Sequence, residues 1–236
     1  MGPVPTVALD GDDRVMFGGA YAVDNFSLVL KMLFLVGAYV VVLLSTNYIA
    51  EGDYAEGEYY FLLLSSVLGM ILMASARDLV TVFMALELLS IPTYMLAGWR
   101  KRDLHGNEAG VKYYLMGVFA SAVMLYGMSL LFGASGSTLL ADIGGAIALP
   151  DSTPFITLGV VVVVIGFAFK VSAVPFHTWA PDTYEGAPTP ITAFLAVLRK
   201  SAAFVALLQL ILIAFASRSD VVEPLMWALS ALTMTV

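Results

Sequence analysis

The chain has 236 residues, of which 60% are hydrophobic and 12% are charged, whereas soluble domains run at roughly 45–50% and about 25%. This composition excludes a water-soluble globule and predicts a polytopic membrane protein. The net charge of −7, with no long basic tract, also excludes nucleic acid as a partner, because nothing could neutralise a phosphate backbone.

Long uncharged runs predict an all-α chain with six to seven transmembrane helices, because about 20 apolar residues can cross a bilayer as a helix. Residues 1–25 are expected to form an N-terminal tail outside the membrane, and residues 26–236 a transmembrane domain. The predicted spans are 26–50, 59–76, 79–99, 109–133, 155–179 and 188–216, with a seventh from Leu225. Since that last run is still apolar at Val236, we expect a piece of a longer protein.

Short loops make neighbouring helices antiparallel, so the side of one loop determines the side of the others. Placing the basic cluster at 100–102 in the cytoplasm puts the loops at 51–58 and 180–187 there as well, and the N-terminal tail outside. Three other basic residues would then lie outside, namely Arg14, Arg77 and Arg218. Only the clustering of basic residues at 100–102 favours this orientation over the inverted one. The loop at 134–154, rich in Gly and Ser around a short apolar stretch, is predicted to be an interfacial turn.

Six charged residues fall inside the predicted spans: Lys31, Glu87, Lys112, Lys170, Arg199 and Lys200. A charge at the bilayer centre costs at least ~2.5–3.5 kcal/mol, so a deep one requires a partner, water or a neutral form. From the helical rise, Glu87 and Lys200 lie about 18 Å, and Lys170 about 15 Å, from the inner ends of their spans. These three therefore lie near the midplane of a ~30 Å core. Such a set predicts sites between which protons can pass.

The other three charges have plainer interpretations. Lys112 lies one turn from the inner end of its span, and Lys31 lies near the outer end of its own. Both lysines can therefore extend to the headgroups. Arg199 neighbours Lys200 but points roughly 100° away around the helix, so we expect it to form a structural salt bridge.

The fifth span contains the proline-rich segment VPFHTWAP at 174–181. Proline removes a helical hydrogen bond, so Pro175 and Pro181 predict a discontinuous helix, broken near Pro175. Broken helices at membrane depth line cavities, and ion paths in transporters often use them. Histidine side chains can exchange protons near neutral pH, so His177, which lies at this break, is expected to take part in the proton path.

Residues 169–200 read FKVSAVPFHTWAPDTYEGAPTPITAFLAVLRK, and this block resembles the antiporter-like subunits of respiratory complex I, the NADH-quinone oxidoreductase. Its YEGAPTPITAFL form is most similar to the subunit N branch. The runs ALELLSIPTY (85–94) and EAGVKYYLMGVFAS (108–121) support a resemblance that extends over about residues 15–236. It implies the fold of the first helix bundle of such a subunit. Family members have two further helices before that bundle and a second, inverted bundle after it.

The resemblance implies a role in proton transfer for each candidate residue. Glu87 matches the membrane glutamate of the family, and Lys170 matches the lysine of the broken helix that pairs with it. Lys200 matches the central-axis lysine, and His177 matches the histidine thought to link these residues to the cytoplasmic side. Lys112 falls where subunit N has an extra lysine, so proton transfer and headgroup contact are equally open for it.

The implied function is proton translocation in the bacterial cytoplasmic membrane, coupled to electron transfer from NADH to quinone in other subunits. The resemblance implies that other subunits hold NADH, FMN, iron–sulfur clusters and quinone. In agreement, this chain has no cysteine to hold a cluster and no glycine-rich nucleotide fingerprint. No cofactor or metal site is expected here. The expected partners are the other membrane-arm subunits and the lipid bilayer. A subunit of a multi-subunit sodium/proton antiporter and a structural scaffold remain as alternatives.

Overall fold

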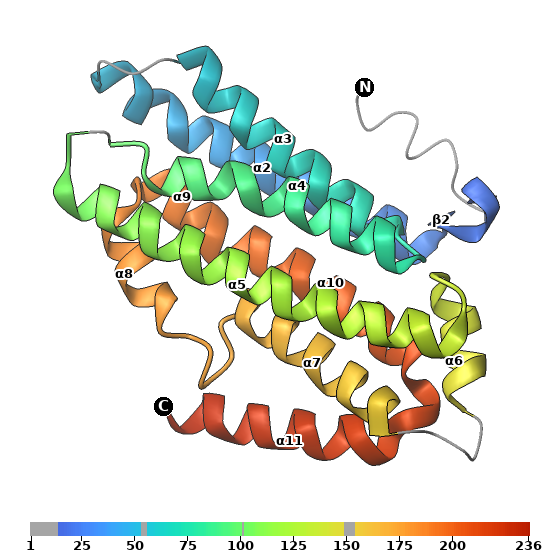
Figure 1. Ribbon diagram of the computed structural model, residues 1–236. Helices are drawn as coiled ribbons and strands as arrows, with labels where there is room; N and C mark the ends of the chain where they lie inside the picture. Colours follow the sequence, from blue (N-terminus) through green and yellow to red (C-terminus); the bar gives the residue numbers. More distant parts are fainter. Residues whose placement is uncertain (1–13, 53–55, 101, 149–153) are drawn as a thin grey trace.

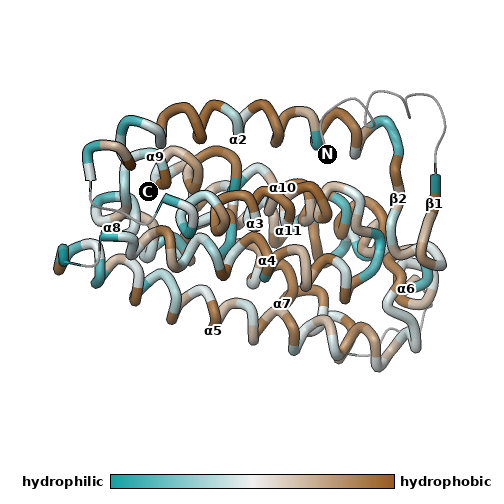
Figure 2. Tube along the Cα trace, turned by 90° about the horizontal axis from the view of Figure 1, so that it is seen from above, coloured by the Kyte–Doolittle hydropathy of each residue, from teal (hydrophilic) through white to brown (hydrophobic). Residues whose placement is uncertain are grey.

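The computed structural model describes residues 14–236 except 53–55, 101 and 149–153. In these residues, antiparallel helices form a bundle, and a two-stranded hairpin precedes them (Figure 1). Figure 2 shows hydrophobic residues along most of the helices and hydrophilic residues gathered around α8 at one end. Five of the described helices are long and apolar enough to cross a membrane. The predicted all-α polytopic fold is confirmed.

The first four helices match the first four predicted spans. They are α2 (Asn25–Glu51), α3 (Glu56–Ser75), α4 (Leu79–Ala97) and α5 (Leu104–Ser135). Helix α2 begins at a capping box, because the Asp24 carboxylate accepts from the Ser27 amide at 2.7 Å and the Ser27 hydroxyl accepts from the Asp24 amide at 3.0 Å. Helix α4 continues through Pro92.

The described part of the predicted N-terminal tail forms a hairpin. Strand β1 (Arg14–Met16) pairs antiparallel with β2 (Tyr21–Val23), and the short helix η1 (Phe17–Gly19) joins them. An ion pair of 2.7 Å between Arg77 and Asp24 ties the end of the hairpin to the turn between α3 and α4. Partial burial alone would raise the pKa of Asp24, but the Ser27 amide and the Arg77 guanidinium hold it below its usual value. Residues 1–13 of the tail lie outside the described residues.

Two glycine positions let neighbouring helices approach closely. On α3, a Cβ atom at Gly69 would lie 2.5 Å from the backbone nitrogen of Leu89 on α4. On α5, a Cβ atom at Gly127 would lie 2.9 Å from the carbonyl oxygen of Gly159 on α7. Small residues at such crossings permit backbone contact between membrane helices. These contacts place α4 against α3 and α7 against α5, the arrangement on which the site below depends.

The loop predicted as an interfacial turn contains a short helix, α6 (Leu140–Ile147). Leu140, Ile143 and Ile147 are buried, and their spacing of three and four residues places them on one face. Helix α6 packs against the end of the last long span, where a Cβ atom at Gly144 would lie 2.6 Å from the carbonyl oxygen of Ile213. The sequence pattern therefore indicated the apolar stretch but not its helical form.

The fifth predicted span ends earlier than expected. Helix α7 covers Pro154–Lys170, and helix α8 covers Trp179–Gly186. Ser172 adopts a left-handed conformation with φ of 60°. Its amide donates to the carbonyl of Phe169 at 3.1 Å, and the Ala173 amide donates to the carbonyl of Ala168 at 2.8 Å. This pair of bonds is a Schellman motif, which ends a helix without proline.

The prolines consequently play different roles from those predicted. The helix ends at Lys170, five residues before Pro175, so the break is not made by Pro175. Pro181 lies in the first turn of α8, where backbone N–H groups have no helical partner and a missing one costs little. The prediction of a discontinuous helix is confirmed, but its cause is the turn at Ser172, and Pro181 belongs to the start of a helix.

The last long span follows the predicted range 188–216 closely. It runs as one helix through α9 (Thr189–Ala193), η2 (Phe194–Arg199), α10 (Lys200–Gln209) and η3 (Leu210–Ala214), of which η2 and η3 have the wider π-helical turn. After η4 (Ala216–Arg218), helix α11 (Ser219–Thr235) begins six residues before the predicted seventh span. Helix α11 lies beside α7 (Figure 1). Near the end of α11, the Thr233 hydroxyl accepts a hydrogen bond from the Val174 amide at 3.0 Å.

Polar contacts join helix ends and neighbouring turns at each end of the bundle. At one end they are Arg100 to Tyr48 at 3.0 Å and Lys112 to Asp182 at 2.6 Å; at the other, Arg77 to Asp24 at 2.7 Å and Arg218 to Thr157 at 2.9 Å. The loops predicted to share a side therefore do share one. Which end faces the cytoplasm stays a prediction.

Candidate proton-transfer site

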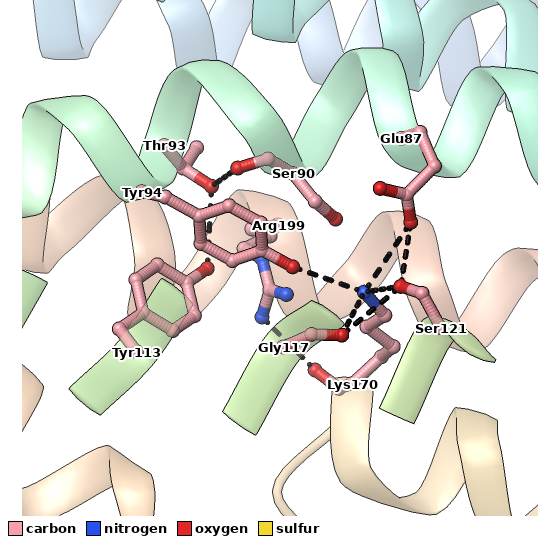
Figure 3. Close-up of polar contacts among 9 residues, drawn as sticks. All are labelled: Glu87, Ser90, Thr93, Tyr94, Tyr113, Gly117, Ser121, Lys170 and Arg199. Atoms are coloured by element: carbon pink, nitrogen blue, oxygen red, sulfur yellow. Dashed lines mark hydrogen bonds and ion pairs between the residues drawn. The ribbon is translucent and has the colours of Figure 1, made fainter. Parts of the chain in front are cut away.

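Lys170 and Glu87 meet between helices α7 and α4 (Figure 3). Lys170 is the last residue of α7 and its side chain is 0% exposed, while the Glu87 side chain on α4 is 17% exposed. The Lys170 Nζ atom lies 3.7 Å from Oε1 of Glu87. A lysine buried this deeply requires a counter-charge or a neutral form. The structure thus brings together the acid and one of the two lysines that were expected to meet.

Ser121 on α5 bridges the pair. Lys170 Nζ donates to Ser121 Oγ at 2.8 Å, and Ser121 Oγ donates to Glu87 Oε1 at 2.6 Å. The same hydroxyl also lies 3.0 Å from the carbonyl oxygen of Gly117. Sequence reasoning missed Ser121, because one serine in a long apolar helix commonly bonds to its own backbone.

The remaining donors of Lys170 face Tyr94 and the backbone of α5. Nζ lies 3.2 Å from the Tyr94 hydroxyl and 3.5 Å from the carbonyl oxygen of Gly117. A Cβ atom at Gly117 would overlap the Tyr94 hydroxyl, so glycine at this position lets the tyrosine reach Lys170. An ammonium group has three donors, and the oxygens of Ser121, Tyr94 and Gly117 can accept all three.

This arrangement can interconvert an ion pair and a neutral pair. If Lys170 passes a proton to Ser121 Oγ while Ser121 passes its own to Glu87 Oε1, the ammonium becomes an amine and the carboxylate becomes a carboxylic acid. The serine hydroxyl is restored in the process. Each transfer crosses a hydrogen bond of 2.8 or 2.6 Å, within the range for direct proton transfer.

Arg199, for which a structural salt bridge was predicted, lies beside this site. It is 1% exposed, and its guanidinium carbon lies 5.1 Å from the ring centre of Tyr113 and 5.3 Å from that of Trp179. Its Nη1 donates to the carbonyl of Lys170 at 3.2 Å. No carboxylate of the described residues forms an ion pair with it, so the salt-bridge prediction is wrong for this part of the chain.

Lys200 lies apart from the pair with which it was expected to act. It is half-buried, and its Nζ lies 5.2 Å from the ring centre of Tyr184 on α8. In the part of the chain that the structure describes, no hydrogen bond or ion pair joins it to Lys170 or Glu87. Equal depth did not bring the two lysines together, because Arg199 at the end of η2, rather than Lys200 at the start of α10, points toward the end of α7.

The other two predicted proton carriers lie nearer the α8 end of the bundle. His177 is half-buried between α7 and α8, and its Nδ1 has no hydrogen-bond partner among the described residues. Lys112 is exposed and forms ion pairs with Glu108 at 2.7 Å and Asp182 at 2.6 Å. It precedes Ser121 on α5 by nine residues, roughly 13 Å along the helix axis.

Lys31, predicted to extend to the headgroups, is instead buried. It is 7% exposed, its Nζ donates to the Tyr21 hydroxyl at 3.1 Å, and the same nitrogen lies 4.9 Å from the centre of the Tyr21 ring. The N-terminal hairpin supplies this partner, and the sequence pattern did not predict the hairpin. No group of three or more His, Cys, Asp or Glu side chains that could hold a metal occurs within the described ranges.

Comparison with known proteins gives the family of the chain. Residues 76–236 match the family described as NADH:quinone oxidoreductase/Mrp antiporter, TM. NADH-quinone oxidoreductase subunit N of Trichlorobacter lovleyi is 42% identical over 227 residues, which cover 93% of this chain and 46% of that protein. Subunit N of Moorella thermoacetica is 43% identical over 218 residues, covering 92% and 46%. The chain spans about half the length of the curated relatives it matches.

Solved structures give the same fold. A chain of respiratory complex I from Thermus thermophilus is 39% identical, with a TM-score of 0.74 over 88% of this chain and 44% of that one. A chain of the Mrp complex from Dietzia sp. has a TM-score of 0.74 at 21% identity, over 91% and 42%, and shares the fold alone. Since the family match covers more than half of its residues, this chain belongs to the NADH:quinone oxidoreductase/Mrp antiporter transmembrane family.

Proposed function

We propose that this chain is part of a proton-translocating membrane-arm subunit of NADH-quinone oxidoreductase. The observation that carries the proposal is a fully buried lysine joined through Ser121 to Glu87. Such an arrangement would contribute little if its role were only to hold helices together, because burying charges costs more free energy than packing apolar side chains of similar volume. The names of the relatives at 42–43% identity support a subunit of NADH-quinone oxidoreductase, whereas the Mrp complex supports only the fold.

In this proposal the chain moves protons and carries no electrons. NADH, FMN, iron–sulfur clusters and quinone would be held by other subunits of the complex, and the remaining membrane-arm subunits and the bilayer would be its partners. A conformational change driven from those subunits would open and close the contact between Lys170 and Glu87. Opening favours the neutral forms of both groups, and closing favours the charged forms.

The proposed path begins at the end of the bundle that holds α8, which would face the cytoplasm, with the N-terminal tail on the outer side of the bacterial inner membrane. Lys112 and His177 lie toward that end and would pass protons inward to Lys170. Lys200, whose Nζ lies 5.2 Å from the ring centre of Tyr184, would be the next carrier after Lys170. The gaps between these side chains require water or side-chain movement, since proton transfer needs contact at hydrogen-bond distance.

Glu87→Gln tests the proposal. In inverted membrane vesicles that hold the whole complex, NADH-driven proton uptake is expected to fall while the amount of assembled complex stays unchanged, because an amide cannot accept the proton of Lys170. Glu223→Gln on the exposed face of α11 is the matched control and should retain uptake. Undiminished uptake in Glu87→Gln would support a scaffold role, and uptake that follows a sodium gradient without NADH would support an antiporter.

Ser121→Ala should separate the bridge from the ion pair. Without the hydroxyl, Lys170 and Glu87 remain 3.7 Å apart with no connecting group, so we expect NADH-driven proton uptake to slow roughly 10-fold or more. This magnitude follows from a hydrogen bond to a charged group, worth about 1.5–3 kcal/mol. Ser129→Ala on the same helix, where the hydroxyl is exposed and donates to the carbonyl of Tyr126, is the control. Equal rates in both variants would remove Ser121 from the path.

A further inference from the structure

Arg199 presents a buried positive charge that the proposed path does not use. The side chain is 1% exposed, and its Nε and Nη2 atoms have no hydrogen-bond partner among the described residues. Arginine stays protonated in proteins, so it cannot pass protons along the path. Buried donors without partners are rare in native proteins and call for an explanation. Arg199 also ends the π-helical segment η2, and such segments are frequent at functional sites.

One plain explanation is that Arg199 caps the broken helix. Its Nη1 donates to the carbonyl of Lys170, which the end of α7 leaves without a helical partner. A neutral amide could make the same bond. The chain uses this solution elsewhere, where Gln209 is 3% exposed and its Nε2 donates to the carbonyl of Ala74 at 2.9 Å. Capping therefore explains one donor of Arg199 and leaves its charge unexplained.

The charge has a clear relation to the proton site. While Glu87 is a carboxylate, its negative charge and the permanent positive charge of Arg199 cancel, so the group is neutral when Lys170 is an amine. When Lys170 is protonated, the group carries one excess positive charge. The faces of Tyr113 and Trp179 stabilise the guanidinium by cation–π contact whatever the state of Lys170. Arg199 thus favours the state in which Lys170 has released its proton.

We propose that Arg199 is a positioning residue that balances the charge of Glu87 whenever Lys170 is deprotonated, and so makes proton release from Lys170 possible. This inference rests on the proposed function. When Lys170 gives its proton to the next carrier of the path rather than to Glu87, Glu87 stays a carboxylate that is only 17% exposed. Without Arg199 that carboxylate would lack a second cation at the site, and the closed Lys170–Glu87 ion pair would hold the proton. The residue acts through Lys170 and does not itself carry protons.

Every element packed around Lys170 contributes to its electrostatic environment. The titratable or charged groups are Glu87 and Tyr94 from α4, Tyr113 from α5, Arg199 from η2, Lys200 at the start of α10 and His177 from the segment between α7 and α8. Among the groups in hydrogen-bond or ion-pair contact with Lys170, Glu87 and Arg199 are the two that carry charge at neutral pH.

The sign of the expected effect follows from this balance. Removal of the positive charge favours the protonated form of Lys170, so release of its proton becomes less favourable. NADH-driven proton uptake by an uncharged variant should therefore fall most on the acidic side, and its pH optimum should move to more alkaline pH. One nearby charge typically produces a displacement of about one pH unit or more.

The experiment measures NADH-driven proton uptake across a pH series in vesicles that contain the whole complex. Arg199→Gln removes the charge but keeps a donor for the Lys170 carbonyl, and Arg199→Met removes both. Both uncharged variants are made, so that one can still be compared with the parent if the other does not assemble. Arg199→Lys, which keeps a cation, should have an optimum closer to that of the parent than either. Gln209→Met, the loss of a buried cap without loss of charge, is the matched control.

Three results would overturn the inference. They are an unchanged pH optimum in both uncharged variants, an equal displacement in Arg199→Lys, or the same displacement in Gln209→Met. Lys170→Met measured in parallel distinguishes this failure from that of the proposed function. If Lys170→Met keeps full uptake, the proposed function itself fails. If it loses uptake while the Arg199 variants keep the parent profile, only the role of Arg199 is rejected.

Discussion

Lys170→Met is expected to lower NADH-driven proton uptake roughly 10²-fold, the effect typical of losing a positioned proton-transfer group. Methionine fills a similar volume but has no proton to give, so the chain from Lys170 through Ser121 to Glu87 is interrupted. Assembly should be retained, because an apolar side chain at a fully buried position avoids the desolvation cost of an ammonium. Uptake by inverted vesicles and the amount of complex on native gels measure the two effects separately.

Lys31→Met is the matched control for this variant. Lys31 is also buried, on α2, but its ammonium contacts Tyr21 of the hairpin rather than a carboxylate. We expect uptake to be retained there. If the two variants lost uptake equally, the loss would reflect the removal of any buried lysine, and the special role of Lys170 would have to be abandoned.

Gly69→Ala is expected to destabilise the packing of α3 on α4 by about 1–3 kcal/mol, the usual cost of overfilling a packed core. The added methyl group would lie 2.5 Å from the backbone nitrogen of Leu89 and 2.8 Å from the carbonyl oxygen of Ala85. Backbone atoms cannot rotate away as a side-chain end can, so the two helices must separate. Because α4 carries Glu87, separation would also loosen the proton site. For this variant we expect a lower aggregation temperature in detergent and a smaller amount of assembled complex.

Gly57→Ala provides the control on the same helix. A Cβ atom there would meet nothing within 4 Å, so the substitution should be neutral or slightly stabilising, since alanine favours helix over glycine. A decrease in the aggregation temperature of similar size for both variants would show that glycine content, rather than the contact with α4, determines stability.

Hydropathy was sufficient to predict the spans because each helix must present an apolar surface to lipid along its whole length. Four predicted spans agree with α2 to α5 within a few residues, and the span at 188–216 agrees with the helix from α9 to η3. The largest difference occurs at α7, where a Schellman motif at Ser172 ends the helix at Lys170. This helix end depends on a left-handed conformation of Ser172, which the sequence does not indicate. Pro175, by contrast, is a residue type that readily suggests a helix break.

The candidate site was predicted only in part. Glu87 and Lys170 could be identified because a charge in an apolar run is rare and costly. Ser121, Tyr94 and Gly117 could not, because each is common in membrane helices and becomes informative only when three helices meet. The mismatch for Lys200 has a related cause. Depth along a helix follows from residue number, but the direction of a side chain depends on the rotation of the helix in the bundle, and the π-helical segment η2 changes that rotation.

Sequence by itself determined that this is a polytopic membrane protein, which segments cross, and that Glu87 and Lys170 lie deep among them. These properties follow from hydrophobicity and helical rise, which are local along the chain. The tertiary structure decided that Ser121 bridges the pair, that Arg199 rather than Lys200 faces Lys170, and that Lys31 is buried against the hairpin. Such contacts join residues far apart in the chain, and only the packing of helices against one another brings their side chains within hydrogen-bond distance.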